Sequence, residues 1–489
     1  MTRAIVFGAA GIAIACALAG CNVVAGLSDL TIDPETTTSS GGGGTGGSTG
    51  GSTGGTISTG GITNTASCSN GVLDKSGGET DVDCGGPCAP CVLTKMCSVA
   101  GDCESGICRP DAGSADPTRK CQGVTKIVAG NAHVCALLTS TELFCWGSNK
   151  HGQLGTGDTN DVSVPTRVPL ANVKEVAAGG PPEDGEKGHT CAIDAADNLY
   201  CWGLNTSGEL GTGDFQDTNL PPVAPALAGA KKVAAGAAFT CAIGSDDKGV
   251  CWGANLYNQL GDGTGLTSTT PVAVVKLDPV SEISAGSLHA CGLLQVGTVA
   301  CWGNSDRGQT AADMLVSSTP VVDVPTLSGA TALSAGNDFT CAIDGAGLSC
   351  WGDNLDGELT ETVPVSATTK PSLLDVSGAT GVAAGADGDA DPNDARGGHT
   401  CALLAGGKVS CWGNNRHGQL GRGTASEKEP SPAEVPGLTG ALEVTAGAEI
   451  TCVRFETGAA ACFGRNDHGQ VGNGQSGEPV SSPVPVAWP

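Results

Sequence analysis

Apolar and polar residues alternate with a period of two over short stretches, and the same stretch returns seven times along the chain. In the sixth copy, Cys401 and Leu403 fall on one face of a predicted strand, and the residues between and beside them fall on the other. The pair Gly406-Gly407 follows, and a second alternating run ends at Trp412. This order predicts a β-hairpin in every copy.

Each hairpin is preceded by a Val/Ala-rich run that ends in Ala-Gly and is followed by a Pro-Val segment, so one copy offers about four short strands. The pattern predicts an all-β fold, a seven-bladed β-propeller, in which radial repetition leaves no long exposed edge. A linear solenoid is the alternative, and it lacks support because neither end carries a polar capping repeat. The first Cys of the seven copies lies at positions 135, 191, 241, 291, 341, 401 and 452.

The clearest copies read HTCALLAGGKVSCWGNNRHGQLG from His399 and HTCAIDAADNLYCWGLNTSGELG from His189. These motifs resemble the repeats of the regulator of chromosome condensation family, in the form common in secreted bacterial members, and the resemblance covers residues 124–489. It implies a seven-bladed propeller. The eukaryotic founder is a guanine-nucleotide exchange factor, which makes exchange activity one alternative function here. Neither its wedge-like insertion nor its basic tail can be placed in this chain.

The amino terminus predicts a lipoprotein. One Arg precedes an apolar run from Ala4 to Leu18, and the run ends in a lipobox at Cys21, the expected site of lipidation. An ordinary cleaved signal or a single-span anchor is the alternative. Asn22 after the Cys favours delivery to the outer membrane, so we expect a lipid-anchored protein of the bacterial cell envelope.

We divide the chain into four parts. The signal peptide spans residues 1–20, the lipidated Cys with a Gly/Ser/Thr-rich linker 21–67, a cysteine-rich module 68–122, and the propeller 123–489. The linker cannot bury enough apolar surface to fold, so we expect a disordered tether with a reach of about 30 Å.

The module holds eight cysteines, and because export favours oxidation we expect four disulfides. Zinc is the alternative, with Cys88 and Cys91 in a C-x-x-C motif and Cys84 and Cys97 as further thiolates. The sequence does not choose among the possible pairings.

The fourteen propeller cysteines form seven pairs, one in each hairpin. Residues opposite each other on antiparallel strands lie within the range that a disulfide accepts, so we expect one cross-strand disulfide per blade. Buried free thiols are the alternative. The expected pairs are Cys135 and Cys145, Cys191 and Cys201, Cys241 and Cys251, Cys291 and Cys301, Cys341 and Cys350, Cys401 and Cys411, and Cys452 and Cys462.

Comparing the seven copies separates core positions from surface positions. Six of the seven Trp residues follow the second Cys, so they are packing residues and not a sugar-binding platform. The position two before the first Cys holds His in four copies, Phe in two and Ile in one. A position that accepts Phe and Ile is an apolar slot, which argues against metal binding or acid–base catalysis by those histidines. We expect the Asn of the following turn to bond its own backbone.

Residues that vary on this constant scaffold are candidates for binding. One group lies in the turn after the second Cys: His151, Arg307, Asp356, His417 and His468. A second group lies in insertions of the second and sixth copies: Glu183, Asp184, Glu186, Lys187 and Arg396. The sixth-copy insertion also carries alternating carboxylates that are candidate calcium ligands, with a solvated loop as the alternative: Asp387, Asp389, Asp391 and Asp394. We expect no other cofactor.

Composition and motifs narrow the function. The chain has 50 Asp and Glu against 24 Lys and Arg, which excludes a nucleic-acid footprint. It contains no nucleophile elbow, phosphate-binding loop or zinc-protease motif. We therefore expect a monomeric, non-catalytic binding scaffold for a protein or a cell-surface polysaccharide, which touches the membrane only through its lipid. A lyase or hydrolase acting in the propeller channel is the alternative.

Overall fold

The structure is a computed structural model of the whole chain. It describes residues 73, 75, 79–82, 84–86, 88–110, 118–181, 186–222, 226–360, 366–386 and 398–489. The cysteine-rich module and the propeller fall in one compact unit, Thr63–Pro489. The lipobox, with Cys21, and the tether lie outside the described residues, as do most of the two insertions. Within the described residues, no helix has the length and apolar character needed to cross a bilayer.

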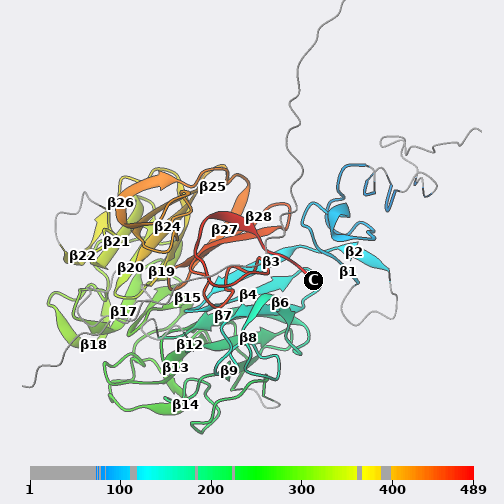
Figure 1. Cartoon of the computed structure of the whole chain (residues 1–489). Coiled ribbons are helices and arrows are strands. Elements are labelled where there is room, and N and C mark those ends of the chain that lie inside the picture. Colours follow the sequence, from blue (N-terminus) through cyan, green and yellow to red (C-terminus); the bar gives the residue numbers. More distant parts are fainter. Residues whose placement is uncertain are drawn as a thin grey trace, which may run out of the picture. The chain divides into compact units, whose positions relative to one another are not determined.

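Residues 124–485 form seven four-stranded antiparallel sheets, and each sheet is built from consecutive strands of one repeat. The predicted seven-bladed propeller is therefore confirmed (Figure 1). We number the blades 1 to 7 along the chain. The innermost strands are β3 (Val124–Ala129), β7 (Val173–Gly179), β11 (Lys232–Ala235), β15 (Val280–Ala285), β19 (Ala332–Ala335), β23 (Ala379–Ala384) and β27 (Ala441–Ala446).

The next two strands of each blade carry the hairpin cysteines and are almost entirely buried. The second strands are β4 (His133–Leu138), β8 (His189–Asp194), β12 (Phe239–Ile243), β16 (His289–Leu294), β20 (Phe339–Asp344), β24 (His399–Leu404) and β28 (Ile450–Phe455). The third strands are β5 (Leu143–Gly147), β9 (Asn198–Gly203), β13 (Gly249–Gly253), β17 (Val299–Ser305), β21 (Gly347–Asp353), β25 (Lys408–Asn415) and β29 (Ala460–Gly464).

The outer strands come from the Pro-Val segments and are only half-buried, as expected for the rim of a propeller. They are β6 (Val162–Arg167), β10 (Leu227–Ala228), β14 (Ser268–Ala273), β18 (Val316–Asp323), β22 (Ala367–Leu373), β26 (Ser426–Glu434) and β30 (Val480–Pro485). Innermost strands contact their neighbours all round the ring, including β27 against β3, which closes it. In Figure 1 the red strands of blade 7 accordingly lie beside the cyan strands of blade 1.

The propeller axis is lined by the Ala-Gly ends of the innermost strands, where backbones of neighbouring blades nearly touch. A Cβ added to Gly286 would lie 2.3 Å from the carbonyl oxygen of Gly336. Only glycine fits such an approach, which explains why every copy keeps it.

The joint between blades is a set of hydrogen bonds to one backbone carbonyl. Trp202 of blade 2 packs into the core of blade 1 and donates its indole Nε1–H to the carbonyl of Gln153, at 3.0 Å. The hydroxyl of Thr190 donates to the same carbonyl at 2.7 Å. Equivalent indole bonds of 2.7 to 3.0 Å join five further blades to the preceding one, and Trp146 uses Gln470 to close the ring. In blade 7 Phe463 fills the slot without a polar bond.

The buried histidines belong to the same joint. Nε2 of His133 lies 2.9 Å from the Thr190 hydroxyl of the next blade. The hydroxyl hydrogen of Thr190 is donated to Gln153, so Nε2 of His133 carries a hydrogen and is the donor in this contact. Burial of the ring favours its neutral form. Burial lowers the pKa of His133 and His289 to about 3. These histidines therefore pack and donate, in keeping with the apolar slot predicted from Phe and Ile in other copies.

The cysteine-rich module is held by disulfides Cys84–Cys91, Cys97–Cys108 and Cys103–Cys121, and Cys88 is also disulfide-bonded. These bonds consume the thiols that the zinc alternative requires. Its described elements are a short 3-10 helix, η1 (Ala100–Asp102), and strands β1 (Cys108–Pro110) and β2 (Arg119–Cys121).

The module packs against the junction of blades 7 and 1. Ile107 is fully buried in one cluster with Phe144, and the Arg109 guanidinium lies 4.8 Å from the centre of the Phe144 ring. Trp488, near the carboxyl terminus, packs edge-to-face against the same ring, with the two ring centres 5.7 Å apart. The module and the last residues of the chain thus cover the seam where the ring closes.

All seven hairpin pairs are cross-strand disulfides, with Cα atoms 4.0 to 4.1 Å apart and the two cysteines in direct register. We therefore predict that protein secreted by an oxidising host has no free propeller thiol. Intact mass after alkylation, with and without prior reduction, measures this. Alkylation of fourteen propeller thiols without reduction would show that the pairs are free.

Replacing His289 by Phe should make the fold less sensitive to acid. The pKa of His289 is about 3 in the folded protein against an ordinary 6.5, so its contribution to stability is complete above pH 6.5 and is lost as the pH falls from there. Blade 5 already carries Phe339 at the position equivalent to His289, and the next blade carries Thr400 at the position equivalent to Thr340, so the repeat accepts Phe beside Thr. The wild type should lose part of its free energy of unfolding between pH 7 and pH 4.5. We expect His289→Phe to lose about 2 kcal/mol less over the same range.

Denaturant titrations at both pH values measure this difference. Phe239→Leu in blade 3, which removes no titratable group, is the control. An unchanged pH dependence in His289→Phe would contradict the assignment of a neutral buried imidazole.

Candidate binding face

The loops between first and second strands and the turns between third and fourth strands emerge on the same face of the propeller. We call this the loop face. The residue after the third-strand Gly donates its amide to a carbonyl of the first loop in every blade, as Ser148 does to Ala132 at 2.8 Å and Arg465 does to Glu449 at 2.8 Å. The two candidate groups, turn residues and insertions, thus come from loops of one face.

Each turn is held rigid by its own side chains. The side-chain oxygen Oδ1 of Asn149 accepts the Leu154 amide at 3.0 Å, and its Nδ2 donates to the backbone carbonyl of Asp158 at 3.1 Å. The Gln153 side chain accepts the His151 amide at 3.0 Å. The predicted self-bonding of the turn Asn is therefore present. The turn presents its variable residues from a fixed backbone.

Most of the predicted turn residues make contacts between blades. His151 contacts Asp217 at 2.8 Å and His417 contacts Glu449 at 3.0 Å. Asp356 is buried and accepts Asn414 Nδ2 at 2.8 Å. Arg307, by contrast, is exposed. Only part of the variable set is therefore presented to solvent.

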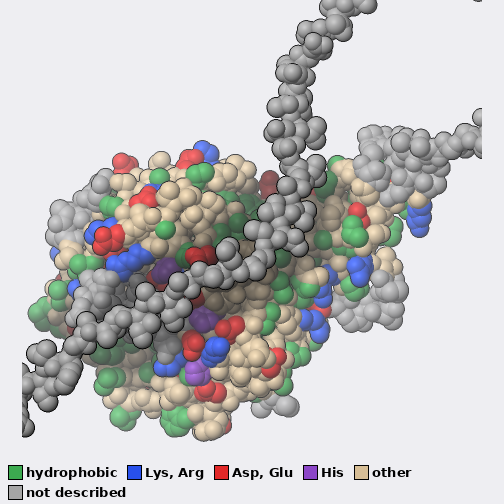
Figure 2. All heavy atoms as spheres, viewed as in Figure 1, with side chains coloured by type: hydrophobic (Ala, Val, Ile, Leu, Met, Phe, Trp, Pro, Cys, Tyr) green, Lys and Arg blue, Asp and Glu red, His purple; other side chains and the backbone are tan. Residues whose placement is uncertain are grey.

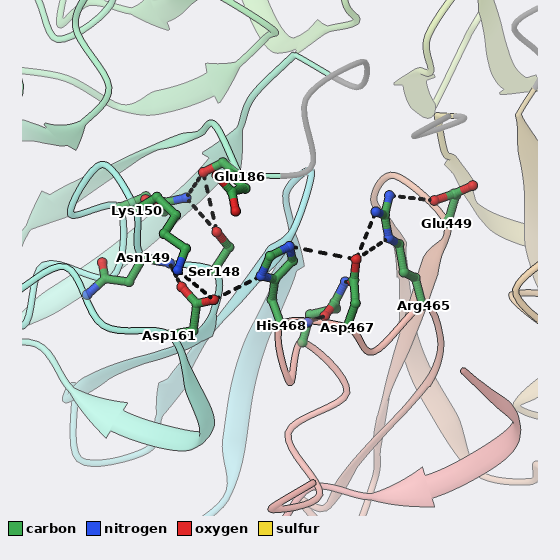
Figure 3. A network of polar contacts seen from close by, with 11 residues as sticks. Ser148, Asn149, Lys150, Asp161, Glu186, Glu449, Arg465, Asp467 and His468 are labelled. Atoms are coloured by element: carbon green, nitrogen blue, oxygen red, sulfur yellow. Dashed lines mark hydrogen bonds and ion pairs between the residues drawn. The ribbon is translucent and has the colours of Figure 1, made fainter. Parts of the chain in front are cut away.

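A continuous polar network crosses the seam between blades 7 and 1 (Figure 3). Arg465 lies between Glu449, at 3.0 Å, and Asp467, at 2.8 Å. His468 then links Asp467 to Asp161 of blade 1, at 3.7 and 2.9 Å. The sequence identified His468 but not its contact with Asp161, because Asp161 lies in another blade.

The network ends at Lys150, which lies 3.6 Å from Asp161. Beside it, the carbonyl of Glu186, from the blade 2 insertion, accepts Gln153 Nε2 at 2.7 Å and the Ser148 hydroxyl at 3.3 Å. The base of this insertion is thus anchored on the blade 1 turn. In Figure 2, acidic, basic and histidine side chains lie close together on the face turned to the viewer.

Several sequence predictions concern residues that the structure does not describe. They are the candidate calcium ligands Asp387, Asp389, Asp391 and Asp394, and the insertion residues Glu183, Asp184 and Arg396. Calcium binding stays a prediction. Among the described residues, one group brings three potential metal ligands together, and its members Cys97, Cys103 and Cys108 are all in disulfides.

Three buried carboxyls on the loop face were missed by the sequence analysis. Glu209 and Glu358 occupy the turn position that is Gln in the other copies, and Asp353 follows the third-strand Gly of blade 5. Burial raises the pKa of Glu209 and of Asp353 to about 7, and it raises that of Glu358 well above its usual value. The sequence signal that could have identified Glu209 and Glu358 is the change from Gln to Glu at this position of the motif.

The axial channel offers no catalytic group among its described lining residues. These are Ala, Gly, Ser287 and Asn131, without a carboxylate, imidazole or phenol. An enzyme that uses the channel would need converging acids or bases there. The lyase or hydrolase alternative therefore finds no support in the channel.

Comparison with known proteins agrees with the fold. Models of the regulator of chromosome condensation (RCC1) repeat match residues 142–181, 197–243, 251–293 and 406–454, and a second model of this repeat matches 124–153 and 280–309.

Among curated relatives, the ultraviolet-B receptor UVR8 of Arabidopsis thaliana is 35% identical over 111 residues, which is 22% of this chain and 24% of the receptor. The probable E3 ubiquitin-protein ligase HERC3 of Homo sapiens is 36% identical over 107 residues, 20% of this chain and 9% of the ligase. The matched region is thus less than a quarter of either relative.

Solved structures show the same fold. Prp20p of Saccharomyces cerevisiae superposes with a TM-score of 0.61 at 22% identity, covering 71% of this chain and 86% of that one. Human WBSCR16 gives 0.61 at 19% identity, covering 71% and 94%. The chain carries regulator of chromosome condensation repeats that form a seven-bladed propeller.

Proposed function

We propose that the protein is a lipid-anchored, non-catalytic scaffold of the bacterial cell envelope that binds a protein partner through the loop face. The observation that carries this proposal is the convergence on one face of the two kinds of loop that depart from the repeat pattern. Loops on a rigid scaffold are where binding residues concentrate. The opposite face, by comparison, carries the tight hairpins between second and third strands and the connections from each outer strand to the next blade.

The apolar side chains on the loop face favour a protein over a polysaccharide. Leu256 and Leu266 in the blade 3 turn are 79% and 71% exposed, and Met314 in the blade 4 turn is 69% exposed. Phe215 and Leu220 add exposed apolar surface in the blade 2 turn. Several exposed apolar groups on one face of a protein are typical of protein interfaces.

Sugar binding usually relies on exposed aromatic platforms. The six hairpin Trp residues are fully buried, so they offer no such platform: Trp146, Trp202, Trp252, Trp302, Trp351 and Trp412. A propeller of the same fold also binds proteins. Yeast RCC1 (Prp20) has been crystallised bound to Kap60, and binding of Prp20p to Gsp1p and histones has been described. These partners are those of the yeast protein, and only the mode, a propeller binding proteins, supports the proposal.

Partner capture from envelope extract by the immobilised mature chain tests the proposal. A variant with Leu256→Ser, Leu266→Ser and Met314→Ser should capture at least tenfold less of the same partner, because it loses apolar contact area. Replacing both insertions by the two-residue connection Ala237-Ala238 of the third copy should abolish capture and leave the fold intact.

The matched control carries Val275→Ser, Val296→Ser and Leu373→Ser. These exposed apolar residues lie at the opposite face, in the hairpin of blade 4 or where outer strands end. Equal capture by the wild type and both loop-face variants, with loss in the control, would move the site to the opposite face.

Anchoring is tested separately. Cys21→Ser should release the protein from the membrane fraction, because lipidation at Cys21 is the expected means of attachment. Fractionation followed by immunoblotting measures the distribution. A Cys21→Ser protein that is processed normally and still sediments with membranes would contradict the lipoprotein assignment.

A further inference from the structure

The repeats provide internal controls for an unusual pair of residues in blade 5. In blades 1, 4 and 6, the side chain after the third-strand Gly bonds to the turn Gln five residues later. Gln153 donates to Ser148 at 3.4 Å, Gln309 to Asn304 at 3.5 Å, and Gln419 to Asn414 at 2.8 Å. The equivalent residues of blade 5 are Asp353 and Glu358.

Two ionised carboxylates cannot make this bond, because both are acceptors. Asp353 is 1% exposed, and no side chain donates a hydrogen bond to its carboxylate oxygens; the nearby Leu355 amide acts to lower the pKa of this carboxyl. Glu358 is fully buried, and its oxygens accept the Gly398 amide at 2.8 Å and the Asp356 amide at 3.0 Å. What the pair lacks is a hydrogen between the two side chains.

The surroundings do not neutralise the pair. Asp338, in the loop between β19 and β20, and Asp356, in the same turn, add negative charge, and Arg307 of blade 4 is the cation that acts on Asp353. Gln309 Nε2 donates to Asp338 at 3.0 Å, and Asn414 Nδ2 donates to Asp356 at 2.8 Å. Asp338 and Asp356 thus already accept hydrogen bonds from neutral side-chain amides. The two acids without a side-chain donor are Asp353 and Glu358.

We propose that Asp353 and Glu358 share one proton, which replaces the amide hydrogen of the other repeats. One carboxyl carries the proton and donates its O–H to the other, ionised carboxylate. On release the proton passes to water and leaves two negative charges at the joint between blades 5 and 6. A shared proton also fits better than a metal ion, because among the described residues no third ligand atom lies close enough to complete a site here.

The pKa directions agree with this geometry. Burial raises the pKa of both carboxyls, and the charge of Asp353 further raises that of Glu358. The folded state thus holds the proton at pH values where the unfolded chain has lost it. The resulting stabilisation is present at acid pH and is lost as the pH rises through about 7.

The position gives the proton a structural consequence. The backbone carbonyl of Glu358 accepts the Trp412 indole at 2.7 Å and the Thr400 hydroxyl at 2.9 Å, and its side chain accepts Gly398 at the end of the blade 6 insertion. Repulsion between two ionised carboxylates acts on this turn directly. The pair is therefore a pH-sensitive element that loosens the loop face between blades 5 and 6 in alkaline conditions.

Difference titration of the folded mature chain tests the proposal. Asp353→Asn and Glu358→Gln should each bind one proton fewer than wild type between pH 5 and pH 9, and the double variant should also bind only one fewer. Two independent buried acids would instead give a loss of two in the double variant, which would overturn the shared proton. Glu209→Gln is the matched control, since Glu209 faces Leu204 at the equivalent position and has no acidic partner there, and its effect should add to that of either variant.

Infrared spectroscopy provides a measurement that does not need the blade 5 variants to be stable. In the Glu209→Gln background, a protonated carboxyl band should persist at pH 6.5, where exposed carboxyls are ionised, and disappear on titration to pH 9. Absence of this band at pH 6.5 would overturn the proposal. So would calcium binding in calorimetry that Asp353→Asn abolishes, because it would show that a metal ion fills the pair.

Discussion

The fold depends on one backbone carbonyl per blade, that of the Gln or Glu in the turn between third and fourth strands. At six of the seven junctions it accepts the indole N–H of the following blade, and in most blades it accepts a Thr hydroxyl as well, as Gln153 does from Trp202 and Thr190. These bonds form in the dry core, where an unpaired indole or carbonyl would be costly. The joint therefore orients each blade on its predecessor, and the Trp supplies apolar contact while its N–H sets the angle.

This joint also explains which positions vary together. Where a His precedes the hairpin Cys, the next blade presents Thr, as in His133 with Thr190. Where the position holds Ile450, the next blade presents Val134 in the same apolar cluster. A polar junction and an apolar junction are each satisfied, but a His without its Thr would leave a buried N–H unpaired. The four histidines are thus products of packing, and their neutral state follows from the surroundings they share.

Much of this architecture could be predicted from the sequence, because it depends on a local alternation of apolar and polar residues that is repeated seven times. The alternation predicted the hairpins, and the number of copies predicted the number of blades. The position of Trp146 directly after Cys145 predicted that its side chain lies in the core. What could not be predicted are the contacts that join residues of different repeats. His468 was recognised as variable, yet its partner Asp161 lies 307 positions earlier in the chain, across the closing seam. The burial of Asp353 was hidden for the same reason.

Because the joint and the loop face use the same turn, a substitution there acts on both. Gln in this turn is neutral and donates to its neighbour, so it supports the joint at any pH. Glu358 keeps the backbone contacts to the next blade but exchanges that donor for an acid, and Asp353 places a second acid at the position that the Gln amide contacts in blades 1, 4 and 6. Evolution of a binding face on this scaffold is thus constrained at the base of the turn, whereas exposed residues such as Leu256 are free to vary. Blade 5 departs from this constraint, and a proton shared by Asp353 and Glu358 would supply the hydrogen that the Gln side chain supplies in blades 1, 4 and 6.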